Sequence, residues 1–193
     1  MAGPRIGRAA ATTGLALALW APPAASYETE PPPGPAFSFK VSSLSGGTIS
    51  DRDFKGKIVI VDVWATWCGP CRMVVPHLVK LQEKYRSKGV SVFGLNADSE
   101  SADEADREPI RRFAAQYGIN YPIGLINEDT YREIGRIMKF DPSEGMSIPT
   151  TFILSREGRV VRGYPGYFRG QEHEIDALVA SLLAPEPAPG KSR

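Results

Sequence analysis

The segment "DVWATWCGPCRMVVP", residues 62–76, contains both cysteines of this 193-residue chain and two of its three tryptophans. Directly before it, residues 58–61 ("IVIV") form a β-branched run that is typical of a strand covered on both faces. From Cys71 to Tyr85 apolar residues recur at helical spacing, and Gly89 then marks the end of the helix. The two cysteines therefore lie where a buried strand gives way to a helix.

This position gives the two sulfur atoms different properties. Cys68 precedes the predicted helix, where the helix dipole and free N–H groups stabilise a thiolate. Cys71, one turn later, can attack a mixed disulfide formed at Cys68. We therefore predict that Cys68 is the solvent-facing, attacking thiol and Cys71 the resolving thiol. A bridge across so short a loop does little to restrict the unfolded chain, which favours chemistry over an inert structural disulfide.

Asp62 interrupts the apolar strand that leads to the cysteines. Burying an unpaired charge is expensive, so this carboxyl is expected to keep its proton more tightly than usual, with a raised pKa. Such a group can take the proton of Cys71 when that sulfur attacks. The alternatives are that Asp62 points into a wet pocket or bonds a backbone amide.

The rest of the chain alternates predicted strands and helices. The strands are expected over residues 37–41, 48–49, 58–65, 90–95, 121–126, 151–154 and 160–164. The helices are expected over residues 71–85, 109–117, 130–138 and 171–183, with Pro109 near the first turn of its helix. An order that begins strand-helix-strand and ends hairpin-helix predicts an α/β fold with a mixed central sheet flanked by helices.

Residues 1–26 have the pattern of an export signal. Two arginines precede an apolar run over residues 9–21, and small residues follow at a cleavage site. We predict a periplasmic protein whose mature chain begins near Tyr27. A membrane-anchored form that keeps this segment is the alternative.

The predicted domains follow from composition. Residues 27–35 form a Pro-rich linker, residues 36–184 one folded domain, and residues 185–193 a disordered tail. The formal net charge of +1 gives no electrostatic reason to expect a nucleic-acid partner.

The stretch "VDVWATWCGPCRMVVP" resembles the active-site segment of thioredoxins, and residues 37–183 resemble the exported TlpA/ResA-like thiol-disulfide oxidoreductases. The resemblance implies a thioredoxin-like fold with an N-terminal β-hairpin and a central insertion, seen in "FAAQYGINYPI". It places Trp67–Cys71 on the redox motif, Asp62 on the buried acid, and Ile148-Pro149-Thr150 on the cis-proline loop that faces the redox pair. The site residues it implies are Cys68, Cys71, Asp62, Trp67 and Pro149.

Two departures from the pattern bear on the proton route. The loop "NADSESADEADRE" is longer and more acidic than in these relatives, and it offers Asp98 or Glu100 as an alternative acid. Thioredoxins also place a lysine near the buried acid, and the matching position here is Gly94.

The function implied is reduction of disulfides in client proteins, by a monomer that needs no cofactor or metal. A membrane protein is implied as the electron donor. Two alternatives use the same thiols. A peroxidase is one, although Ala65 and Val61 stand where its Thr and Pro belong. A copper or zinc carrier is the other; a zinc site would need two more ligands, for which only His77 and His173 are candidates.

Overall fold

The computed structural model describes residue 3, residues 34–99 and residues 103–184. Apart from Gly3, the predicted signal peptide 1–26 lies outside the described residues, as do most of the linker 27–35 and the tail 185–193. Within the described ranges, no helix combines the length and apolar character needed to cross a membrane.

Seven strands of the described residues form one sheet in the order β2-β1-β5-β4-β3-β6-β7. The strands are β1 (Lys40–Ser43), β2 (Thr48–Ser50), β3 (Ile58–Trp64), β4 (Val90–Asn96), β5 (Ile123–Leu125), β6 (Thr150–Leu154) and β7 (Val160–Pro165). The α-helices are α1 (Cys71–Tyr85), α2 (Glu104–Gln116), α3 (Glu128–Met138) and α4 (Gln171–Leu183), with short 3-10 turns at Asp51–Phe54, Arg86–Lys88 and Pro142–Glu144. Strands β3, β4 and β5 are parallel and the other pairings antiparallel, so the sheet is mixed, as predicted.

Strand β3 is the central strand for the chemistry, and all seven of its residues are buried. Its β-branched residues suit a strand with helices on both faces. In register, Asp62 lies beside Gly94 of β4 on one side and Thr151 of β6 on the other. The acid therefore sits in the middle of the sheet, away from every edge.

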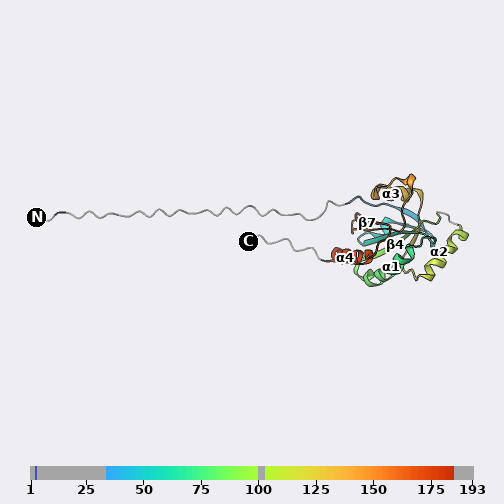
Figure 1. The fold of residues 1–193 in the computed structure, drawn as a ribbon, viewed down its shortest axis with the longest axis horizontal. Helices are drawn as coiled ribbons and strands as arrows, with labels where there is room; N and C mark the ends of the chain where they lie inside the picture. The colour runs from blue at the N-terminus through green and yellow to red at the C-terminus, as the bar shows by residue number, and fades with distance from the viewer. Residues whose placement is uncertain (1–2, 4–33, 100–102, 185–193) are drawn as a thin grey trace. The chain divides into compact units, whose positions relative to one another are not determined.

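The helices cover the two faces of the sheet unequally (Figure 1), with α3 on one face and α1, α2 and α4 on the other. Alternation along β3 directs Val59, Val61 and Val63 to the α3 face. The residues between them, Asp62 among them, face α1. The carboxyl therefore shares its face with the helix that begins at Cys71.

The N-terminal hairpin and the central insertion both extend the sheet. Strands β1 and β2 form the hairpin, and β1 pairs with β5, which follows α2 in the insertion. β5 in turn pairs with β4. The insertion thus connects the hairpin to the central strands.

Two expected boundaries are wrong by three residues or more. Helix α2 begins at Glu104, five residues earlier than predicted, so Pro109 lies in its second turn. Acidic residues at 104 and 106 favour this earlier start by complementing the helix dipole. Strand β1 begins at Lys40 rather than at Phe37. The backbone before Lys40 pairs elsewhere: the Phe37 N–H donates to the Gly158 carbonyl at 3.0 Å, and Ala36 bridges to Arg159.

Candidate active site

The two cysteines form a disulfide at the start of α1, with Cα atoms 5.4 Å apart. Cys71 is the first residue of the helix, and Cys68 lies in the turn before it. The backbone N–H of Cys71 donates to Cys68 Sγ at 3.2 Å. A free N–H of the first helical turn therefore points at the sulfur that the sequence predicts as the attacking one.

The prediction that Cys68 faces solvent is wrong for this oxidised state, because Cys68 is 3% exposed and Cys71 is fully buried. Both cysteines belong to an apolar cluster with Trp64 and Val75, and Ile148 packs against it. Exposure alone does not separate the two sulfurs. What does separate them is the N–H bond to Cys68 and its place before the helix.

The turn before Cys68 is fixed to the end of β4. The Asp98 carboxylate accepts bonds from the Thr66 backbone N–H at 2.9 Å and from the Thr66 hydroxyl at 2.9 Å. Asn96 donates its side-chain amide to Asp98 at 2.7 Å, and Arg72 donates to the Thr66 carbonyl at 3.3 Å. All hydrogen-bonding groups of Thr66 are thus held, which positions the redox loop that follows.

Asp62 is fully buried and only half satisfied. Its Oδ1 accepts a bond from the Thr151 hydroxyl at 2.8 Å, while its Oδ2 has no hydrogen-bond partner among the described residues. Burial raises the pKa of Asp62 from its ordinary value of 3.8 to about 7, and the Thr151 bond opposes that rise. The direction of this shift agrees with the expected raised pKa, and the partner of Asp62 is a side-chain hydroxyl where a backbone amide was the alternative.

The Pro149 loop lies at the same end of the sheet as the disulfide. The Ile148–Pro149 peptide bond is cis. The next residue, Thr150, pairs with Val63 near the end of β3, from which the cysteine loop leaves. The Pro149 carbonyl accepts a bond from the Gly166 N–H at 2.7 Å, and the positive φ of Gly166 (75°) is one that a side chain would strain.

Trp67 lies beside the disulfide and is exposed. Its residue surface is 69% accessible, and Met73 in the first turn of α1 is also exposed. Trp64, only three residues before Trp67, is fully buried and stacks on Phe113. The two tryptophans of the opening motif therefore differ in role: one belongs to the core and the other to the surface around Cys68.

The remaining candidates lie apart from the disulfide or outside the described residues. Glu100 is outside them. The carboxylate of Asp98 is occupied by Thr66 and Asn96. His77 on α1 is half-buried, and burial lowers its pKa, although nearby acidic residues of α4 act in the opposite sense. Within residues 34–99 and 103–184, no three His, Cys, Asp or Glu side chains gather as a metal site requires.

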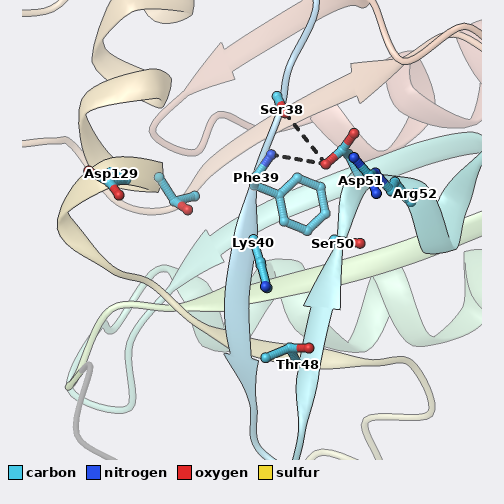
Figure 2. A pocket seen from close by; sticks show the side chains of 9 residues that line it. Ser38, Phe39, Lys40, Thr48, Ser50, Asp51, Arg52 and Asp129 are labelled. Carbon is cyan, nitrogen blue, oxygen red and sulfur yellow. Dashed lines mark hydrogen bonds between the residues drawn. The ribbon is translucent and has the colours of Figure 1, made fainter.

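A pocket of about 570 Å³ opens beside the β1–β2 hairpin (Figure 2). Its lining residues are Ser38, Phe39, Lys40, Thr48, Ser50, Asp51, Arg52, Asp129 and Thr130. Asp51 accepts bonds from the Phe39 N–H and the Ser38 hydroxyl, as the dashed lines show. No residue of the disulfide, of the Pro149 loop or of the Asp62 environment lines it, so it is separate from the redox site.

A mixed sheet whose central strand leads into a CxxC disulfide at a helix start, with a cis-proline loop at the same end, defines a thioredoxin-like protein. The Redoxin family model matches residues 32–179, and the chain belongs to this family. The predicted fold class and the predicted resemblance to TlpA/ResA-like proteins are both confirmed.

The thiol-disulfide oxidoreductase ResA of Bacillus thuringiensis subsp. konkukian (strain 97-27) is 33% identical over 129 residues, which cover 67% of this chain and 66% of ResA, just under two thirds of its length. The thioredoxin-like protein YneN of Bacillus subtilis (strain 168) is 34% identical over 136 residues, 70% of this chain and 72% of YneN. A thiol:disulfide interchange protein of Chlorobium tepidum TLS, from the thioredoxin family, has a similar crystal structure: the TM-score is 0.66 at 27% identity, over 80% of this chain and 99% of that one.

Sequence reasoning missed the polar residues that support the site. Thr66, Asn96 and Thr151 were not singled out. The only available signal was weak: Asn96 and Asp98 are polar residues directly after a buried strand, where loops carry function. Asp98 bonds Thr66, and Asp62 bonds Thr151, across long stretches of sequence, and such contacts leave no local pattern.

Proposed function

We propose that this protein is an exported thiol-disulfide oxidoreductase that reduces disulfides in client proteins. The observation that carries the proposal is the Cys68–Cys71 disulfide at the start of α1, with the Cys71 N–H directed at Cys68 Sγ. The same N–H stabilises a Cys68 thiolate when the pair is reduced.

The reaction begins from the reduced dithiol. The Cys68 thiolate attacks a client disulfide, so a Cys68–client bond forms, the client S–S bond breaks, and one client thiolate leaves. Cys71 then loses its proton to Asp62 and attacks Cys68 Sγ. The Cys68–Cys71 bond forms, the mixed disulfide breaks, and the second client sulfur leaves as a thiolate that takes up a proton. Two electrons have passed from the dithiol to the client.

Asp62 suits the role of proton acceptor. It is buried on the face of β3 that packs against α1, the helix that begins at Cys71. Its raised pKa, about 7, lies near a neutral working pH. A base with such a pKa can take a thiol proton and still release it afterwards.

The oxidised pair needs a donor of two electrons before the next cycle. In an oxidising compartment we propose a membrane protein that relays electrons to Cys68–Cys71, with the enzyme itself a monomer. Signal cleavage near Tyr27 would place it in the periplasm. N-terminal sequencing of the protein from a periplasmic fraction tests this: the mature chain is expected to begin near Tyr27, and an intact Met1 in the membrane fraction would show the anchored form.

The central experiment is a trap in the native compartment. A Cys71→Ser variant is expected to accumulate mixed disulfides on Cys68 that mass spectrometry identifies, whereas a Cys68→Ser, Cys71→Ser double variant should accumulate none. Equal capture by both variants would contradict the mechanism.

The same purified protein distinguishes the two alternatives. A peroxidase would consume hydrogen peroxide with Cys68 at a rate far above that of disulfide exchange. A carrier would bind Cu⁺ or Zn²⁺ stoichiometrically in the reduced form and lose that binding in Cys68→Ser. Fast exchange with protein disulfides, without either result, supports the oxidoreductase.

A further inference from the structure

Six buried polar side-chain atoms of the described residues have no hydrogen-bond partner, and three of the six belong to side chains that border Gly94 of β4. These three are Asp62 Oδ2, Trp64 Nε1 and the Tyr121 hydroxyl. Asp62 and Trp64 are fully buried, and Tyr121 is 7% exposed. Native proteins rarely leave such groups unpaired, so three of them in one region need an explanation.

The three groups border the same residue, Gly94. Asp62 and Gly94 are register partners on β3 and β4. A Cβ atom added to Gly94 would lie 2.9 Å from Trp64 Nε1 and 3.2 Å from Tyr121 Cε2. The indole and the phenol ring therefore approach the bare backbone of β4 next to the acid.

The chemistry of the three groups is complementary. The indole N–H only donates, the phenol donates or accepts, and the ionised carboxyl only accepts. An ordered buried water typically makes about three hydrogen bonds to buried groups that otherwise lack partners. One water can therefore take a bond from Trp64 and from Tyr121 and donate to Asp62.

We propose that Tyr121 is a positioning residue for Asp62: through one shared ordered water, its hydroxyl and the Trp64 indole N–H stabilise the free oxygen of the Asp62 carboxylate. The proposal rests on the function proposed above, in which Asp62 accepts the Cys71 proton. Tyr121 itself gives up no proton in the reaction.

The described neighbours of Asp62 on β4, β6 and α1 do not supply this hydrogen bond to its free oxygen. On β4 the neighbour is Gly94, which has no side chain, and on β6 it is the neutral Thr151, which bonds the other carboxylate oxygen. On α1, the disulfide of the oxidised protein carries no charge. His77, also on α1, interacts electrostatically with Glu172, Asp176 and Lys80, and Asp62 is not among the groups that shift its pKa.

Tyr121 stays a neutral donor while Asp62 titrates. Burial raises the pKa of Tyr121 well above its usual range, and the charge of Asp62 raises it further. A donor that favours the ionised carboxyl holds the pKa of Asp62 below the value that burial alone would give.

The test is Tyr121→Phe, which deletes the hydroxyl and keeps the ring. In the oxidised protein the cysteines do not titrate. The assigned ¹³C resonance of the Asp62 carboxyl carbon therefore reports the pKa of Asp62 without a contribution from the thiols. The pKa of Asp62 is expected to rise by about one unit in Tyr121→Phe, because a donor to the charged form is lost. An unchanged or lower pKa overturns the proposal.

The matched control is Tyr117→Phe. Tyr117 packs on Phe113, which stacks on Trp64, but its hydroxyl is not among the unpartnered buried atoms. No shift at Asp62 is expected. A high-resolution crystal structure of the native protein supplies a second test: a water is expected within hydrogen-bonding distance of all three atoms, and its absence counts against the proposal even if a variant fails to fold.

Kinetic measurements distinguish the role proposed for Tyr121 from the proposed function, in which Asp62 accepts the Cys71 proton. In Tyr121→Phe the pH profile for resolution of the mixed disulfide should move to higher pH by the same shift that NMR measures. If Asp62→Asn resolves at the native rate, the role of Asp62 is wrong, whatever the NMR titration shows. If Asp62→Asn is slow but Tyr121→Phe leaves both the titration and the profile unmoved, the proposed function stands and the role of Tyr121 is overturned.

Discussion

The Asp98 carboxylate takes both donors of Thr66, its backbone N–H and its hydroxyl, each at 2.9 Å. These residues are 32 positions apart, at the ends of neighbouring parallel strands. The Ala97 N–H adds a bond to the Trp64 carbonyl at 2.8 Å. The loop that carries Cys68 is therefore fixed to β4 before the helix begins.

Asp98→Ala should loosen this loop. It leaves the Thr66 N–H and the Asn96 amide without their acceptor, which costs about 1–3 kcal/mol of unfolding free energy. Attack by Cys68 on a small disulfide should slow as well. Urea unfolding and stopped-flow reduction measure the two effects. Glu108→Ala, at an exposed acid beyond the first turn of α2, is the control and should change neither. Native behaviour of Asp98→Ala would show that the loop keeps its conformation without Asp98.

Alkylation should distinguish the cysteines in the reduced protein. Iodoacetamide at neutral pH is expected to modify Cys68 first, because the Cys71 N–H at the start of the helix stabilises the Cys68 thiolate. Peptide mass spectrometry over time measures both rates. Faster modification of Cys71 would reverse the assignment of roles.

Asp62→Asn should change the pH dependence of stability. The native carboxyl has a pKa of about 7 against an ordinary 3.8, so its proton is bound more tightly in the folded state. The contribution of this bound proton to the free energy of unfolding is therefore fully present below about pH 4 and decreases as pH rises towards 7. The amide side chain of the variant does not ionise, so the unfolding free energy of Asp62→Asn should increase relative to that of the native protein across this window, by an amount on the order of a few kcal/mol.

Urea unfolding of the oxidised proteins at several pH values checks this difference. Glu108→Gln, at an exposed position beyond the first turn of α2, should follow the native curve. Parallel curves for Asp62→Asn and the native protein would mean that Asp62 ionises normally in the fold.

Substitution of the two tryptophans of the motif should have different effects, with Trp67→Ala weakening client binding and Trp64→Ala lowering stability. Trp67→Ala removes a 69% exposed side chain, so the unfolding free energy should stay within about 0.5 kcal/mol of native. KM for a protein disulfide should rise, since an exposed aromatic beside Cys68 offers apolar contact area. Trp64→Ala is the counterpart: it opens a cavity in the core and should cost about 3–5 kcal/mol. If Trp67→Ala binds clients normally, its exposure has no role in docking.

Local pattern in the sequence determined the framework of the site. The β-branched run before Asp62 and the helical spacing after Cys71 give β3 and α1 with nearly the predicted bounds. The apolar neighbours of Asp62 also predicted its burial and the rise in its pKa. Such features depend on residues close in the chain, and for that reason they can be read from it.

Only the tertiary structure decided which groups meet. Thr151 bonds Asp62 from 89 positions away, and Tyr121 reaches Gly94 because β4 and β5 pair in register. The burial of Cys68, which the sequence placed in solvent, comes from packing in a cluster that Ile148 helps to cover. Periodicity determines which face of an element is buried, but hydrogen-bond partners depend on strand order and register across long loops, which no local pattern encodes.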